Sequence, residues 1–142
     1  MHSPTAAVVY RSRTGTTRRL AEEIGAYLRS RNVAVTVVSV GECDLQALDA
    51  VDYLLLGCWT NGLFVVLQHP DGPWSAFARD LPRLTHPRVA LFTTYRLLTG
   101  SMFGRMRQEL VDKTPAPALE LKSRDGRLSA ADRQALDGFI GA

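Results

Sequence analysis

The chain has 142 residues, of which 46% are hydrophobic and 22% are charged, a composition that indicates a globular domain and excludes a disordered chain. Its net charge of +3 is a mild basic excess that does not indicate nucleic-acid binding. No apolar run approaches the roughly 20 residues of a membrane-spanning helix, and no basic segment precedes a long apolar stretch as in a signal peptide. We therefore predict one domain over residues 1–142, with no membrane span and a cytoplasmic location.

The first part of the chain alternates strand and helix patterns. Residues 6–10 are a continuous apolar run, typical of a strand buried on both faces. After a polar turn, apolar residues recur at helical spacing over residues 20–28, and Thr16 or Thr17 is expected to cap this helix. Residues 33–40 are rich in β-branched side chains, which predicts a second strand.

The third strand is predicted over residues 51–57, after a short helix that Asp44 caps. It opens into a long loop, residues 58–71, in which residues 63–67 are unusually apolar. This apolar stretch is expected to be a lid over a ligand, a short extra strand or a subunit contact. Pro73 then suits the first turn of the next helix.

The second half of the chain continues the alternation. Residues 88–94 contain a fourth buried strand, and a loop then leads to a helix that Ser101 caps. A weaker fifth strand over residues 118–121 precedes a last helix, which starts with Ser129 and Asp132 at capping-box spacing. Five strands alternating with helices predict an α/β fold, a three-layer α/β/α sandwich around a parallel sheet, and right-handed crossovers favour the strand order 2-1-3-4-5.

Polar residues follow the first strand directly, and their composition is that of a phosphate-binding loop. In a sheet of this order, ligands bind beyond the carboxyl ends of the first and third strands. Gly15 allows a close backbone approach, and the N-terminus of the following helix supplies N–H groups and a favourable dipole. A simple turn with a helix cap is the alternative. The predicted phosphate-binding residues are Ser12, Arg13, Thr14, Gly15, Thr16 and Thr17.

Other classes of site do not fit the sequence. It has neither the P-loop motif of nucleoside triphosphatases nor the Gly-x-Gly-x-x-Gly motif of dinucleotide-binding domains. The loop after the first strand lacks the cysteine nucleophile of a small tyrosine phosphatase, and acidic residues of a receiver domain are missing from the strand ends. Cys43 and Cys58 are predicted to be free thiols, and no cysteine or histidine spacing indicates a metal site.

Residues 8–21, Val-Val-Tyr-Arg-Ser-Arg-Thr-Gly-Thr-Thr-Arg-Arg-Leu-Ala, resemble the opening strand, FMN-phosphate loop and first helix of flavodoxins. The order of elements is similar over nearly the whole chain. The resemblance implies a flavodoxin-like sandwich with FMN as its cofactor. In that family the loops after the third and fourth strands hold the isoalloxazine ring, often between aromatic side chains.

The resemblance therefore implies ring contacts from two loops. Trp59 falls where the family often has its inner aromatic residue, because a flat apolar side chain stacks on the flavin and excludes water. Tyr95 is expected either on the flavin or in simple packing. The Asn61-Gly62 pair tolerates positive φ and could supply a peptide that reorients with the redox state. The predicted ring-binding residues are Cys58, Trp59, Thr60, Asn61, Gly62, Thr93, Thr94, Tyr95, Gly100 and Ser101.

Three functions are consistent with these patterns. The first is an FMN-binding electron-transfer protein, a redox carrier in preference to a stand-alone enzyme, since no convergent set of His, Asp and Glu indicates an acid or base. Its partner would be a reductase or acceptor enzyme, and the basic charge of this chain suggests an acidic docking face on that partner. The second is an FMN-dependent NAD(P)H:quinone-type reductase. The third is a flavodoxin-like module that has lost its flavin.

Overall fold

The computed structural model describes residues 3–63, 66–96 and 99–141. Within these ranges, five parallel strands form one sheet in the order β2-β1-β3-β6-β7. Counted along the chain, these strands have the predicted order 2-1-3-4-5, so this prediction is confirmed. The strands are β1 (Thr5–Arg11), β2 (Ala34–Ser39), β3 (Tyr53–Trp59), β6 (Arg88–Thr94) and β7 (Leu119–Ser123).

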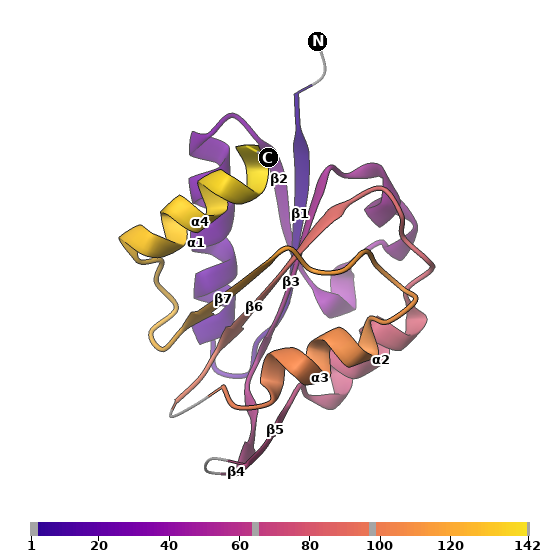
Figure 1. Ribbon diagram of the computed structural model, residues 1–142, viewed down its shortest axis with the longest axis vertical. Coiled ribbons are helices and arrows are strands. Elements are labelled where there is room, and N and C mark those ends of the chain that lie inside the picture. Colours follow the sequence, from indigo (N-terminus) through magenta and orange to yellow (C-terminus); the bar gives the residue numbers. More distant parts are fainter. Residues whose placement is uncertain (1–2, 64–65, 97–98, 142) are drawn as a thin grey trace.

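Helices cover both faces of the sheet, which confirms the three-layer α/β/α prediction (Figure 1). Helices α1 (Thr16–Ser30) and α4 (Ala130–Gly141) pack on one face, and helices α2 (Gly72–Asp80) and α3 (Met102–Glu109) pack on the other. Two short 3-10 helices, η1 (Val40–Glu42) and η2 (Leu45–Ala50), connect β2 to β3. None of the helices in the described ranges is long and apolar enough to cross a membrane.

The central strands are buried on both faces because successive side chains point to opposite sides. Val8 and Leu55 lie in the core beneath α1 and α4, whereas Val9, Leu54 and Leu56 lie in the core beneath α2 and α3. All five side chains are fully buried. Each contributes roughly 1.5–3 kcal/mol relative to an exposed side chain, so the double-sided burial stabilises the parallel sheet.

Several local predictions are confirmed. The fourth strand covers the predicted residues 88–94, and Asp44 caps η2 by accepting a hydrogen bond from the backbone N–H of Gln46. The capping box of α4 is reciprocal: the N–H of Ser129 donates to the Asp132 carboxylate, and the N–H of Asp132 donates to Ser129 Oγ. These features depend on residues close together in the sequence, which is why local patterns predict them.

The segment after β3 differs from the predicted long loop. Strand β3 continues through Trp59, and β4 (Asn61–Leu63) and β5 (Val66–His69) then form an antiparallel hairpin that projects beyond the carboxyl edge of the sheet (Figure 1). Of the three interpretations of residues 63–67, the extra strand is therefore the one that the structure has, and residues 64 and 65 lie outside the described residues. The buried Gln68 anchors the hairpin because its backbone carbonyl accepts a hydrogen bond from Ser101 Oγ over 2.8 Å.

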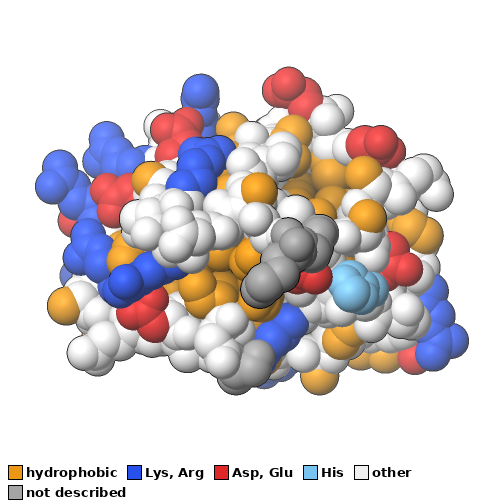
Figure 2. All heavy atoms as spheres, turned by 90° about the horizontal axis from the view of Figure 1, so that it is seen from above, with side chains coloured by type: hydrophobic (Ala, Val, Ile, Leu, Met, Phe, Trp, Pro, Cys, Tyr) orange, Lys and Arg blue, Asp and Glu red, His pale blue; other side chains and the backbone are white. Residues whose placement is uncertain are grey.

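The opposite end of the molecule, where the N-terminus emerges, is the amino edge of the sheet (Figure 2). Lys and Arg side chains gather there on the side that α1 and α4 occupy. The Asp52 carboxylate accepts a hydrogen bond from the N–H of Thr5, and Asp49 accepts hydrogen bonds from the N–H groups of Thr85 and His86. Hydrogen bonds between residues far apart in the sequence close this edge, whereas loops and the hairpin extend the other one.

Candidate functional site

The β1–α1 loop forms the start of the candidate site. Gly15 is the N-cap residue of α1, with φ +99°, and its N–H donates to Ser12 Oγ over 3.0 Å. Among the described residues, no side chain caps α1, and its first turn contains no acidic residue. Because the first N–H groups of a helix have no partners inside the helix, this N-terminus offers donors and the positive end of the dipole to an anion.

The predicted phosphate-binding residues divide into two groups. Arg13, Thr14 and Gly15 are exposed, and Ser12 and Thr16 are half-buried, so these five are open to a ligand. Thr17 is only 1% exposed, and its Oγ1 lies 2.6 Å from Thr94 Oγ1. The hydroxyl of Thr17 therefore joins α1 to the end of β6.

The prediction that Thr16 or Thr17 caps α1 is wrong. The helix begins at Thr16, and Gly15 occupies the N-cap position without a side chain. The left-handed conformation of Gly15 costs little for a glycine, and it turns the chain from the strand into the helix within a few residues. The loop thus leaves unused the N–H groups that a threonine cap would have occupied.

Trp59, the last residue of β3, lies beside this loop. Its indole Nε1 donates to Asp71 Oδ2 over 2.7 Å, and the half-buried ring packs against the core beneath α2 and α3. The guanidinium carbon of Arg13 lies 5.1 Å from the centre of the ring, a cation–π distance. The structure therefore brings the predicted aromatic residue next to the predicted phosphate loop.

The neighbouring residues Cys58 and Thr60 use their polar groups inside the protein. The Cys58 thiol is fully buried, and this burial raises its pKa, so the side chain is a neutral part of the core. The carbonyl of Cys58 accepts a hydrogen bond from Thr93 Oγ1 over 2.6 Å. Thr60 contacts β6 twice, through its N–H to the Thr94 carbonyl and through its hydroxyl to Thr93 Oγ1. These bonds fix the end of β3 against β6.

Tyr95 lies on the other side of β6. Its N–H donates to the Ser123 carbonyl of β7, and its ring is 5.9 Å from Lys122 Nζ and 5.5 Å from the Arg124 guanidinium carbon. Strand β6 separates β7 from β3, which carries Trp59. Tyr95 therefore lies on the β7 side of β6, next to the cations of Lys122 and Arg124.

The remaining predicted residues connect the hairpin to the loop before α3. Gly100 has φ +50°, and a Cβ at this position would lie 2.1 Å from Gln68 Oε1. Ser101 is the N-cap residue of α3, but its hydroxyl donates to the Gln68 carbonyl and does not cap the helix. Asn61 and Gly62 belong to β4, where the pairing with β5 is irregular between Asn61 and Leu63. The hairpin is thus attached to the loop that follows β6.

Sequence reasoning missed Asp71 and Arg11. Asp71 is buried at the N-cap of α2, and its Oδ2 accepts hydrogen bonds from Arg11 Nε and Trp59 Nε1, both over 2.7 Å. The available signal was local: an aspartate just before Gly72 and Pro73 is a typical helix start. That signal predicts the cap, but the contacts to two strand ends depend on the tertiary fold.

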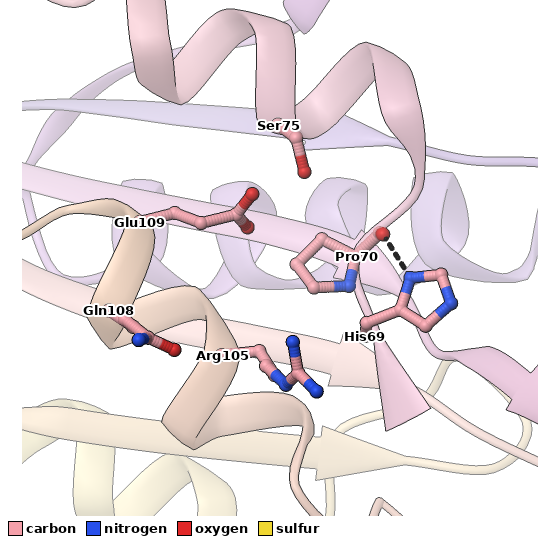
Figure 3. A pocket seen from close by; sticks show the side chains of 6 residues that line it. All are labelled: His69, Pro70, Ser75, Arg105, Gln108 and Glu109. Carbon is pink, nitrogen blue, oxygen red and sulfur yellow. Dashed lines mark hydrogen bonds between the residues drawn. The ribbon is translucent and has the colours of Figure 1, made fainter. Parts of the chain in front are cut away.

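A pocket of about 190 Å³ lies between β5, α2 and α3 (Figure 3). The ring nitrogen Nδ1 of His69 is 2.7 Å from the Pro70 carbonyl oxygen, and Glu109 Oε2 is buried without a hydrogen-bond partner among the described residues. The pocket is smaller than the roughly 300 Å³ at which ordinary ligand pockets begin. No group of three or more metal-binding side chains occurs in the described part of the chain. The residues that line the pocket are His69, Pro70, Ser75, Arg105, Gln108 and Glu109.

Comparisons with known proteins identify the family. The family model of the flavodoxin domain matches residues 7–109, well over half of the chain. The chain belongs to the flavodoxin family. A flavodoxin from Megasphaera elsdenii is 29% identical over 106 residues, which cover 74% of this chain and 75% of that protein.

Solved flavodoxin structures have the same fold as this chain. The solution structure of two-electron reduced M. elsdenii flavodoxin superposes with a TM-score of 0.75 and 22% identity, covering 96% of this chain and 99% of that one. A short-chain flavodoxin associated with a non-canonical PDU bacterial microcompartment gives a TM-score of 0.74 and 19% identity, covering 97% and 95% of the two chains. At these identities the likeness shows the fold.

FMN is the cofactor of flavodoxins, and the residues of the β1–α1 loop fit its phosphate. The uncapped N-terminus of α1 provides backbone donors, and Ser12, Thr14 and Thr16 provide hydroxyls that are not fully buried. No carboxylate lies in the first turn to repel a phosphate. This donor set matches the charge and the hydrogen-bonding capacity of a phosphate monoester.

Proposed function

We propose that this flavodoxin is an electron carrier that holds FMN in the loops after β1, β3 and β6 and passes electrons to a protein partner. The observation that carries the proposal is the uncapped N-terminus of α1, with Trp59 packed directly beside it. The phosphate would bind the N–H groups of Thr14, Thr16 and Thr17 and the hydroxyls of Ser12, Thr14 and Thr16, because the N–H of Gly15 already donates to Ser12 Oγ. When bound, FMN supplies reversible uptake of electrons at its ring system.

The isoalloxazine ring would lie between the end of β3 and the loop after β6. Trp59 offers an aromatic surface there, and its hydrogen bond to Asp71 holds the indole in one orientation. The hydrogen bonds of Thr60 to Thr93 and Thr94 keep the two loops at a fixed separation. Such a rigid site would exclude water from one side of the ring without contributing an acid or a base.

The rim of this edge supports a partner with an acidic docking face. Four exposed cations lie at this edge: Arg13, Arg96 and Arg124 follow strands β1, β6 and β7, and Lys122 is the next-to-last residue of β7. Complementary charge steers two proteins together and raises their association rate at low ionic strength. The rim would therefore select a negatively charged acceptor or donor.

The proposal is tested by loading the purified protein with FMN, reducing it and mixing it with electron acceptors of opposite charge. We expect anionic ferricyanide to be reduced faster than a cationic cobalt complex, with a rate that falls as salt is added. Lys122→Glu together with Arg124→Glu should remove most of this salt dependence. The control Arg83→Glu, at an exposed position that precedes β6 on the opposite edge, should preserve it.

Other outcomes would overturn the carrier function. Rapid steady-state turnover of NADH with a quinone by the protein alone would favour the reductase. A purified protein that does not bind added FMN would favour the module that has lost its flavin. A salt dependence that is the same in the rim variant and in wild type would contradict the acidic partner.

A further inference from the structure

Asp71 is the point at which three elements of the candidate site meet. Its Oδ2 accepts hydrogen bonds from Arg11 at the end of β1 and from Trp59 at the end of β3, each over 2.7 Å. Its Oδ1 accepts a hydrogen bond from the N–H of Trp74 in the first turn of α2 and lies 3.7 Å from the Cys58 sulfur. The side chain of Asp71 is only 8% exposed, so water does not compete strongly for these bonds.

The two side chains that Asp71 holds stand immediately before the two loops of the site. Ser12, the first residue of the phosphate loop, follows Arg11, and Thr60 follows Trp59. Arg11 is paired in register with Cys58, so the two strand ends are adjacent, and Asp71 lies against both of them. A shift of this carboxylate would move the indole and the start of the phosphate loop together.

We propose that Asp71 is a positioning residue that sets the distance and orientation between the phosphate loop and the Trp59 ring, and that its charge offsets the positive charge of Arg11 beside the flavin. The inference rests on the proposed function, since it assumes that FMN lies at this edge. Hydrogen bonds from charged and polar donors to one buried carboxylate are stronger than neutral ones, which suits a role in holding geometry.

The first test is made on the FMN-free protein, so it does not depend on the proposed function. The indole N–H signal of Trp59 is assigned by NMR through its loss in Trp59→Phe, and its hydrogen exchange is measured. In Asp71→Asn we expect this signal to shift and to exchange at least about tenfold faster, because the amide is a weaker acceptor for two donors. Asparagine is a good N-cap residue, so α2 should still form.

The matched control is Asp49→Asn. Asp49 also accepts two hydrogen bonds through its carboxylate, but at the amino edge of the sheet. This variant should leave the Trp59 signal and its exchange unchanged. An unshifted, equally protected Trp59 signal in Asp71→Asn would overturn the inference, whether or not the protein binds FMN.

The second test measures FMN affinity and the midpoint potential. We expect about tenfold weaker FMN binding in Asp71→Asn, together with a higher potential, because an unpaired Arg11 favours the more negative reduced flavin. Arg11→Gln should lower the potential, and the double variant should return it toward wild type.

If Asp71→Asn does not fold, Arg11→Gln still tests the charge pairing, because an unchanged midpoint potential in Arg11→Gln would contradict that pairing. Wild type that fails to bind FMN would instead refute the proposed function, and the NMR result would stand by itself.

Discussion

The starts of α1 and α4 are built in opposite ways. Helix α4 satisfies its own N-terminus through the reciprocal hydrogen bonds of Ser129 and Asp132, whereas α1 begins on Gly15 with no side-chain cap and no acidic residue in its first turn. Both helices cover the same face of the sheet, so packing does not explain the difference. The comparison shows that α4 satisfies donors at its own N-terminus, whereas α1 leaves them open, which is the feature on which the proposed phosphate site depends.

The largest expected effect comes from making α1 resemble α4. Thr16→Glu puts a carboxylate in the first turn of α1, where it takes the place of a bound anion. We expect FMN affinity to fall about a hundredfold through charge repulsion at close range, while the FMN-free protein becomes about 0.5 kcal/mol more stable through the helix dipole. Fluorescence titration and urea unfolding measure the two quantities.

Thr16→Gln is the control for the added side-chain volume and for the lost hydroxyl. It should weaken FMN binding by about tenfold, less than Thr16→Glu does, because it removes one hydrogen-bond donor to the phosphate but adds no charge. Equal FMN affinities of wild type and Thr16→Glu would show that α1 has no role in phosphate binding.

The next effect concerns the start of α3, which also has no side-chain cap. Gly100→Ala forces a Cβ against Gln68 at a residue with positive φ, and we expect the free energy of unfolding to fall by about 2 kcal/mol. Gly104→Ala, inside α3 with room for a methyl group, should instead stabilise the protein by about 0.5 kcal/mol. Urea unfolding of both variants checks the sign. If both variants change the free energy of unfolding by the same small amount, the hairpin is not anchored at Gly100.

A smaller effect is expected from making α4 resemble α1. Asp132→Ala removes one half of the capping box and should lower the free energy of unfolding by about 1 kcal/mol. FMN affinity should not change, because α4 begins after β7 and has no part in the phosphate loop. Thermal unfolding and FMN titration measure the two effects, and a loss of FMN affinity would contradict the division of roles.

The last prediction separates the two cysteines by pH. Burial and the nearby Asp44 raise the pKa of Cys43 from 9.0 to about 11, and burial raises the pKa of Cys58 as well. Because the folded protein keeps these protons while the unfolded chain loses them near pH 9, the free energy of unfolding should fall between about pH 9 and 11. Alkylation of the half-buried Cys43 should accelerate up to about pH 11, and Cys58 should stay unmodified in the folded protein. Mass spectrometry of the protein alkylated at a series of pH values measures the modification of both cysteines. An alkylation rate of Cys43 that levels off at pH 9 would contradict the raised pKa of its thiol.

Local patterns predicted the parallel sheet, the cap at Asp44 and the α4 capping box, because each depends on neighbours in the sequence or on simple alternation. They left residues 63–67 open between a lid, an extra strand and a subunit contact, since strands as short as β4 and β5 have little periodicity and the hairpin is held by the hydrogen bond of Ser101 to the buried Gln68. They missed the contacts of Asp71, which join residues far apart in the chain.

The flavin site is tested by titrating FMN into the purified protein and following flavin fluorescence. We expect saturable quenching at one FMN per chain, with shifted visible absorption bands and a much weaker response in Thr16→Glu. Fluorescence and absorption identical to those of free FMN, in wild type and variant alike, would contradict the claim that the α1 N-terminus and Trp59 form a flavin site.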